Sequence, residues 1–349
     1  VGKDALGASN GDYNVAVGND ALLANTTADK GTAIGYKALV ATTTGSSNTA
    51  VGYQALAGNT TGNTNIAIGY ETLFTNTQGD RSTALGFQAL YTSNPSGNAD
   101  MYNVGVGYHA LKATTTGLRN TAVGGLALEA NTDADYNTAI GYAALGANTT
   151  GDNNTAVGYE ALEKNTTAAE NVAVGHKALN SNTTGAQNTS VGTFAGYTHT
   201  TGNNLTAVGY YAAYTNSGGE NTAFGSEALK LNTTGSSLTA IGFRALEENT
   251  TGADSTAVGR DALEANTTGD GHVAVGRDAL TNNTTGDYNT AIGQNALLTN
   301  TTGSSNTAVG RNALDANTTA DYNTAVGYLA LTANTTGTTN TAVGCGALD

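Results

Sequence analysis

Aromatic side chains recur at a fixed interval along much of this sequence, each two positions after an apolar residue and one after a glycine. A regular strip of amphipathic rings is suited to binding sugars or another surface. The same position also accepts Arg260, Arg277 and Ser226, which predicts that it is at least partly exposed. The alternative interpretation is a stacked ladder that covers a sheet. The candidate aromatic strip comprises Tyr36, Tyr53, Tyr70, Phe87, Tyr108, Tyr142, Tyr159 and Tyr210.

A second repeated group is Asn followed by Thr-Thr, which is formally an acceptor sequence for N-linked glycosylation. The alternative is an amide ladder, in which each Asn bonds the next copy of itself at a turn. The two interpretations compete, because an amide held in a ladder is not free for modification. The candidate asparagine column contains Asn148, Asn165, Asn182, Asn232, Asn249, Asn266, Asn283, Asn300, Asn317 and Asn334.

Other chemistry is poorly supported by the residues. Thr on a flat sheet can order water as ice-binding solenoids do, but consecutive Thr residues should point in different directions. The four His residues stand at unrelated positions, without metal-ligand spacing. Catalysis needs unlike groups that converge in a concave pocket, and no P-loop, dinucleotide fingerprint or nucleophile elbow is present. We therefore expect no enzyme activity, cofactor or metal.

The elements that position these residues are set by an internal repeat. We take the apolar residue before each recurrent Gly as the reference position; it occurs 21 times from Val1 to Val343. Seventeen of the 20 intervals are 17 residues long, and the consensus is N-T-A-V-G-Y-x-A-L-x-x-N-T-T-G-x-x. Self-similarity at a short fixed period predicts a repeat architecture.

A period of 17 residues is too short for a helical repeat and suits one coil of a parallel β-solenoid. We expect an all-β fold of about 20 coils, a β-roll, with T-A-V-G-Y as one strand, A-L-x-x as a second and N-T-T-G as a turn. The reference column and the Leu column are expected to form two buried ridges. The small Ala and Gly on either side of the reference position predict close approach of another backbone, and we expect several chains packed or intertwined, most simply as a homotrimer.

The repeat consensus also resembles the repeats of two related groups of proteins. Thr-Ala-Val-Gly-Tyr-Gln-Ala at 49–55 and Ile-Ala-Ile-Gly-Tyr-Glu-Thr at 66–72 are similar to the head repeats of trimeric autotransporter adhesins. The whole array is similar to repeat shafts of phage tail-fibre-like proteins. The resemblance implies a left-handed parallel β-roll, three chains side by side, and a role as a shaft or adhesive head. The adhesin repeat is usually shorter and carries Val where this chain has Thr.

The composition limits the classes of partner and the location that we expect for this chain. The net charge is −14, and the 13 basic residues are scattered, so a nucleic-acid partner is not expected. There is no apolar run long enough to insert into a membrane. The lone Cys345 excludes an internal disulfide framework. We expect a fibre that is extracellular, at a cell surface or in a virion tail fibre, with self-association and a host-surface glycan or protein as partners.

The domain prediction is one continuous array over 1–349, forming part of a longer protein, with an irregular coil at 86–106. That coil is 21 residues long and contains the only Pro and the only Met. Its four extra residues are expected to form a loop at a turn. A second irregularity is Gly196, which interrupts the Leu column and predicts a weak or kinked coil.

Overall fold

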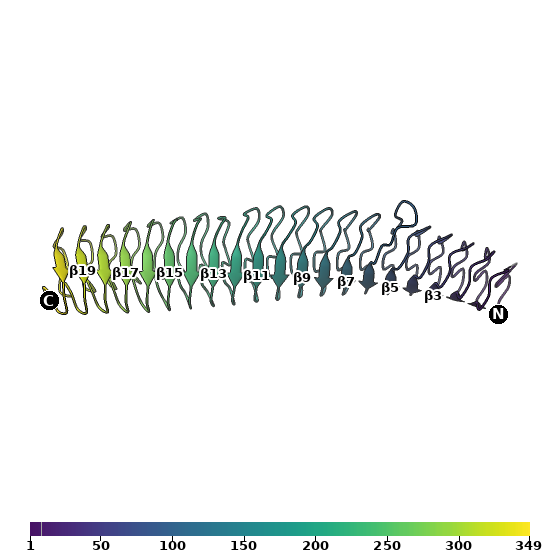
Figure 1. Cartoon of the computed structure of the whole chain (residues 1–349), viewed down its shortest axis with the longest axis horizontal. Coiled ribbons are helices and arrows are strands. Elements are labelled where there is room, and N and C mark those ends of the chain that lie inside the picture. The colour runs from purple at the N-terminus through teal and green to yellow at the C-terminus, as the bar shows by residue number, and fades with distance from the viewer. Residues whose placement is uncertain (8) are drawn as a thin grey trace. The chain divides into compact units, whose positions relative to one another are not determined.

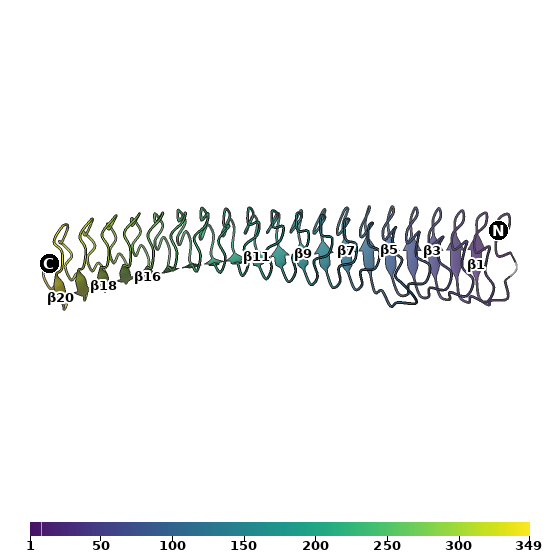
Figure 2. The same ribbon diagram turned by 90° about the horizontal axis from the view of Figure 1, so that it is seen from above.

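The structure is a computed structural model that describes residues 1–7 and 9–349. These residues divide into two compact units, Val1–Ala173 and Val174–Asp349. All regular structure in the described residues is β, in strands of three residues, one to a coil. Within each unit, successive strands lie side by side in chain order, as Figures 1 and 2 show from two directions. The expected all-β parallel solenoid with a 17-residue repeat is confirmed.

The strands carry the T-A-V part of the repeat. The first unit contains β1 (Val15–Val17), β2 (Thr32–Ile34), β3 (Thr49–Val51), β4 (Ile66–Ile68), β5 (Thr83–Leu85), β6 (Val104–Val106), β7 (Thr121–Val123), β8 (Thr138–Ile140) and β9 (Thr155–Val157). Strand β10 (Val172–Val174) spans the boundary. The second unit contains β11 (Thr189–Val191), β12 (Thr206–Val208), β13 (Thr222–Phe224), β14 (Thr239–Ile241), β15 (Thr256–Val258), β16 (Val273–Val275), β17 (Thr290–Ile292), β18 (Thr307–Val309), β19 (Thr324–Val326) and β20 (Thr341–Val343).

Each strand pairs in parallel with the strand one repeat further along, without a slip in register. Thr49 stands opposite Ile66 and Val51 opposite Ile68 in the first unit. In the second unit Thr290 stands opposite Thr307, with the same offset of one coil. Equivalent side chains of neighbouring coils therefore lie directly above one another at about the 4.8 Å spacing of paired strands.

The Gly after each reference residue ends the strand and lets neighbouring coils approach. Gly52 has a φ of 136°, a conformation that side chains disfavour. A Cβ atom at this position would overlap the carbonyl oxygen of Gly69 in the next coil. Both the backbone angle and the close approach require glycine, which explains why the Gly recurs in every copy of the repeat.

The predicted second strand is wrong. The A-L-x-x segment forms a turn, because Gln54 and Leu56 have φ values of 50° and 54°, in the left-handed region. A third non-glycine residue in the same coil, Thr64, has a φ of 58°. The coil thus closes through three left-handed residues, and it needs only one strand.

The interior of each coil is filled by Ala and Leu columns. In the coil of β3, Ala50, Ala55 and Leu56 are all 0% exposed. The predicted burial of the Leu column is confirmed, but that of the reference column is wrong. Ile34 is 39% exposed and Phe224 54%. Because side chains alternate across a strand, the Ala that faces inward forces the residue on either side of it to face outward.

The coil around Gly196 keeps its packing because a second residue nearby also departs from the consensus. Leu205 replaces the Asn found at the corresponding place in most coils and is completely buried. Its Cδ2 atom lies 3.3 Å from the point that a Cβ atom of Gly196 would occupy. The apolar volume lost with the missing Leu is therefore replaced from the following coil.

The irregular coil places its extra residues in a loop between β5 and β6 (Figure 1). The loop folds back along its unit: the Thr61 hydroxyl donates to Asn98 Oδ1 at 3.2 Å, and Arg81 pairs with Asp100. Met101 closes the loop and is 1% exposed. Residues 86–106 thus remain attached to the coils on which they rest.

Candidate interaction surface

The aromatic strip is a stacked ladder through five successive coils. The ring centroids of Tyr36, Tyr53, Tyr70, Phe87 and Tyr108 are separated by 5.3, 5.0, 5.1 and 5.5 Å in turn. The planes of neighbouring rings differ by 7–18°. Desolvation by these neighbours, together with the charge of Glu71, raises the pKa of Tyr70.

Stacking decides which part of each ring is available. The five side chains are 40–54% exposed, and their faces are covered by the rings above and below. The strip therefore presents ring edges and phenol hydroxyls to solvent. A sugar ring prefers an open aromatic face, so the interior of the ladder is a poor platform for carbohydrate.

The remaining members of the strip are arranged in two ways. Tyr142 and Tyr159 stack at 5.5 Å, as in the ladder. Tyr210 instead meets Tyr211 edge to face, with a 4.3 Å centroid separation and an angle of 79°. Desolvation and the hydrogen bond with Tyr211 raise the pKa of Tyr210.

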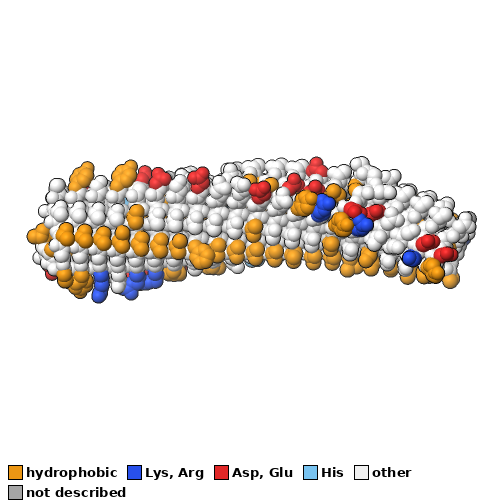
Figure 3. Space-filling view, in the orientation of Figure 1, with side chains coloured by type: hydrophobic (Ala, Val, Ile, Leu, Met, Phe, Trp, Pro, Cys, Tyr) orange, Lys and Arg blue, Asp and Glu red, His pale blue; other side chains and the backbone are white. Residues whose placement is uncertain are grey.

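Beside the strip lies a surface without charge, which we call the outward face. It consists of the first and third residues of the twenty strands, all in the described part of the chain. Each of these residues is Thr, Val, Ile, Leu or Phe. Figure 3 shows a row of hydrophobic side chains along the visible side of each unit, with basic side chains next to it in the second unit. An exposed apolar surface of this extent is typical of an interaction site.

The asparagine column forms a buried amide ladder. Asn249 Nδ2 donates to Asn232 Oδ1 at 2.8 Å, and Asn266 Nδ2 donates to Asn249 Oδ1 at the same distance. The same pattern joins Asn148 to Asn165, and the steps from Asn266 through Asn283, Asn300 and Asn317 to Asn334. Asn182 Nδ2 donates to the Gly185 carbonyl at 2.9 Å. All of these Asn residues except Asn334 are fully buried, so the folded chain withholds their amides from glycosylation.

A second asparagine ladder, which the sequence pattern left unassigned, stands at the start of most strands. The backbone N–H of Asn65 donates to Asn48 Oδ1 at 2.9 Å, and Asn48 Nδ2 donates to the Gly62 carbonyl at 2.7 Å. Buried polar groups must be paired, and these amides pair across coils. The signal in the sequence was the Asn that precedes T-A-V in most repeats.

Two histidines replace Asn within these ladders. His199 is fully buried, and its Nε2 lies 2.7 Å from the Gly202 carbonyl. His272 is 1% exposed, and its Nδ1 accepts the backbone N–H of Asn289 at 3.2 Å. Burial lowers the pKa of both, that of His272 to about 4. Residues 1–7 and 9–349 contain no group of three His, Cys, Asp or Glu side chains placed to hold a metal ion.

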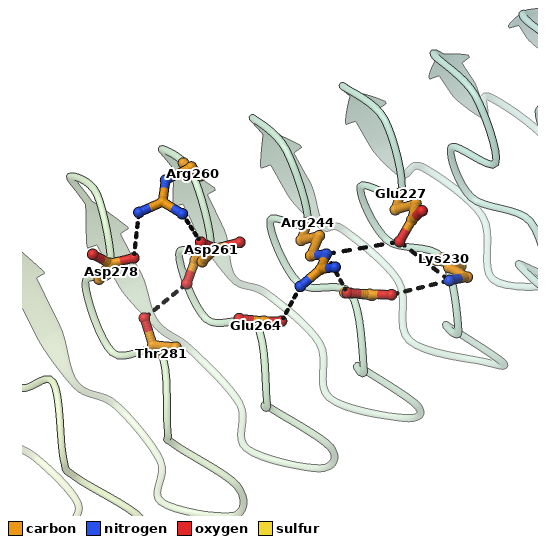
Figure 4. A network of polar contacts seen from close by, with 9 residues as sticks. Glu227, Lys230, Arg244, Arg260, Asp261, Glu264, Asp278 and Thr281 are labelled. Carbon is orange, nitrogen blue, oxygen red and sulfur yellow. Dashed lines mark hydrogen bonds and ion pairs between the residues drawn. The ribbon is translucent and has the colours of Figure 1, made fainter.

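Several charged side chains of the second unit pair with one another, both within a coil and between neighbouring coils (Figure 4). Lys230 Nζ lies 3.2 Å from Glu227 and 3.1 Å from Glu247, and Arg244 lies 3.3 Å from Glu264. Desolvation lowers the pKa of Lys230, but its two carboxylate partners outweigh this effect and raise it. These groups are engaged in stabilising pairs and do not converge on a cavity.

A notch in the first unit has a volume of about 200 Å³. It forms where Ala143 and Gly146 replace longer side chains between Glu129 and Glu163. Pockets that bind small molecules usually hold about 300 Å³ or more, so this notch is small for a ligand site.

None of the described residues forms a helix with the length and apolarity required to cross a membrane. Comparisons of this chain with protein-family models, with curated proteins and with solved structures each find no match.

Proposed function

We propose that the chain is a structural, adhesive fibre shaft that spaces or displays a receptor-binding element away from a cell or virion surface. The observation that carries the proposal is the unbroken register of the strands within each unit, where every coil repeats the bonds of the one before. Such an array gains length in equal steps and gives each coil the same support. The proposed location is extracellular, at a cell surface or in a virion tail fibre.

The proposed role is mechanical and includes no catalytic step. It is supported by the way the polar side chains are used, since the Asn ladders and several ion pairs of the second unit, such as Lys230 with Glu247, join one coil to the next. The proposed partners are other copies of the chain, as a homotrimer or another homo-oligomer. The uncharged outward face supports self-association, because water would otherwise cover a long apolar surface.

Removal of whole coils tests the shaft. Deletion of residues 242–309 takes out four complete repeats. We expect a folded protein whose longest dimension in small-angle scattering falls by about 19 Å, at about 4.8 Å for each coil. Deletion of residues 242–250, about half a repeat, is the control and should unfold the second unit by shifting Leu out of its column. An unchanged longest dimension after removal of four coils would contradict the shaft.

A second candidate function is contact of the aromatic strip with host glycans, which is supported by the exposed edges and hydroxyls of Tyr36, Tyr53 and Tyr70. A glycan array with the wild type and the triple Ala variant tests it, and only loss of binding in the variant supports the strip. Ice binding has less support, because Thr hydroxyls such as that of Thr60 are bonded to the carbonyl oxygen of Thr77 at 2.9 Å. An ice-affinity assay tests that alternative.

A further inference from the structure

A glycine interrupts the column of aromatic side chains in the first unit. Gly125 stands at the aromatic position between Tyr108 and Tyr142, and no other repeat has Gly at that position. The backbone does not require it, because Gly125 lies outside the left-handed region that favours glycine. Packing does not require it either, since a Cβ atom there would lie 3.6 Å from Cδ2 of Tyr142, an ordinary contact. What Gly125 provides is therefore the absence of a side chain.

The missing side chain leaves two ring faces uncovered, and we call the space over Gly125 between Tyr108 and Tyr142 the ring slot. Tyr108 stacks on Phe87 and Tyr142 on Tyr159, so the second face of each ring is turned toward Gly125. Tyr108 is 54% exposed and Tyr142 49%, against 41% for Phe87, which has a ring on both sides. All of these residues belong to the first unit. The slot therefore has the open aromatic faces that the interior of the ladder lacks.

Polar groups stand beside one wall of the ring slot. The ring centroid of His109 lies 3.8 Å from that of Tyr108 and 5.8 Å from that of Phe87. The second distance is too short for a ring on the slot side of Tyr108, so His109 leaves the slot open. Its Nδ1 lies 3.0 Å from Oε1 of Glu129, whose side chain is 37% exposed. Glu129 belongs to the same coil as Gly125 and places hydrogen-bond acceptors at the level of the slot.

The notch described above adjoins the ring slot. Leu126 and Ala143, which line the notch, directly follow Gly125 and Tyr142 in the sequence. Glu129 lines the notch as well. The notch alone is small for a ligand, but together with the slot it provides two aromatic walls and a polar hollow at their edge. Apolar walls with a few well-placed polar groups are typical of sites that bind small molecules.

The width of the ring slot suits one ring. Tyr108 and Tyr142 are two coils apart, which corresponds to about 10 Å at the spacing of paired strands. Inside the ladder the same step, from Tyr53 to Phe87, holds one further ring, that of Tyr70, with centroid separations of 5.0 and 5.1 Å. A separation of about 5 Å from each wall accommodates an aromatic ring or the slightly thicker ring of a sugar.

We propose that the ring slot binds one uncharged sugar residue of a glycan. The C–H faces of the sugar ring lie against Tyr108 and Tyr142, and hydroxyl groups at its rim donate to Glu129. A purely aromatic guest would use the walls but not the carboxylate beside them. The charge of Glu129, in a chain whose net charge is −14, disfavours an acidic sugar. The inference rests on the proposed contact with host glycans and moves that contact from the ring edges of the strip to this slot.

The first experiment is saturation-transfer NMR on the whole chain with the methyl glycosides of glucose, galactose, mannose and N-acetylglucosamine. We expect transfer to the ring C–H protons of at least one glycoside. Gly125→Tyr restores the ladder residue and should abolish the transfer without changing the circular dichroism spectrum. Ser226→Tyr, which fills a one-residue interruption between Tyr210 and Phe243 in the second unit, is the matched control and should leave it unchanged. Transfer to no glycoside, transfer to indole alone, or equal loss in both variants overturns the inference.

The second experiment separates the ring slot from the rest of the strip by titrating the glycoside that binds. Tyr142→Leu removes one wall and should weaken binding about two- to tenfold. Glu129→Leu should weaken it severalfold, whereas Glu129→Gln, which keeps an acceptor oxygen, should bind as the wild type does. The triple Ala variant of Tyr36, Tyr53 and Tyr70 should also bind normally. Loss in the triple variant with normal binding by Tyr142→Leu overturns the slot and leaves the strip as the glycan site, and only the coil-deletion experiment bears on the shaft itself.

Discussion

His272 makes the second unit sensitive to acid. Its imidazole is 1% exposed, within the second asparagine ladder, and Nδ1 accepts the backbone N–H of Asn289. The proton of the neutral ring is therefore on Nε2, and the ring is also hydrogen-bonded to the backbone of Gly286. A proton on Nδ1 would oppose the N–H of Asn289. Burial lowers the pKa to about 4, an effect that the carboxylates of Asp287 and Asp270 offset only in part.

The change in the free energy of unfolding with pH follows from the linkage between proton binding and folding. The unfolded chain has an ordinary His pKa of about 6.5, so the stability contributed by the neutral buried ring is complete above that pH. It is lost as the pH falls through the window from about 6.5 to about 4, where the unfolded chain binds the extra proton. With these two values the free energy of unfolding falls by about 2 kcal/mol between pH 7 and pH 5.

The assay is urea unfolding of wild type and His272→Asn at pH 7 and pH 5. Asn restores the side chain found at this position in most other coils, so the variant should fold and should lose about 2 kcal/mol less on acidification. His176→Asn, at an exposed position, is the control and should behave as the wild type. An equal acid response in wild type and His272→Asn would refute the assignment of the effect to this ring.

Three other substitutions test the packing of the coils. Gly242→Ala forces a Cβ atom against the next coil's carbonyl oxygen at a φ of 135° and should destabilise the fold by about 3 kcal/mol in thermal unfolding; Gly97→Ala, with open space around it and a φ of 76°, should cost only about 1–2 kcal/mol. Asn266→Ala leaves buried amides unpaired and should cost about 1–3 kcal/mol in urea unfolding, whereas Thr268→Ala on the exposed turn should change stability by less than about 0.5 kcal/mol. Arg244→Ala should cost less than about 1 kcal/mol, and the difference should shrink in 1 M salt, because its side chain is 42% exposed; an undiminished loss in high salt contradicts an electrostatic role.

The period of the repeat predicted the fold because stacking converts equal spacing in the sequence into equal position in space. The burial of Leu56 and the ladder of Asn249 and Asn266 follow from that same relation. The path of the chain within one coil could not be predicted in the same way. Leu56 adopts a left-handed conformation that its residue type does not favour, and it does so because the side chain is buried between identical neighbours.

The orientation of the reference column could not be predicted from the residue pattern of so short a strand. Val and Ile favour burial, and alternation alone leaves open which side of a three-residue strand faces inward. The small Ala between them decides the matter, because the coil encloses room for Ala50 on this wall once Leu56 occupies the centre. The larger side chains are consequently placed outside, where a single chain gives them no cover.

The absence of charge on the outward face supports the self-association that we propose. A buried column restricts residue type through the space available, but these positions are partly exposed and would accept Lys or Glu, as the solvated faces of antiparallel sheets do. Strand propensity is insufficient as a cause, because it varies by only about 1 kcal/mol among residues. The neighbouring aromatic position is also exposed and admits Arg260 and Arg277. Exposure therefore does not exclude charge in this part of the coil, and the self-association that we propose would account for its absence from the twenty strands.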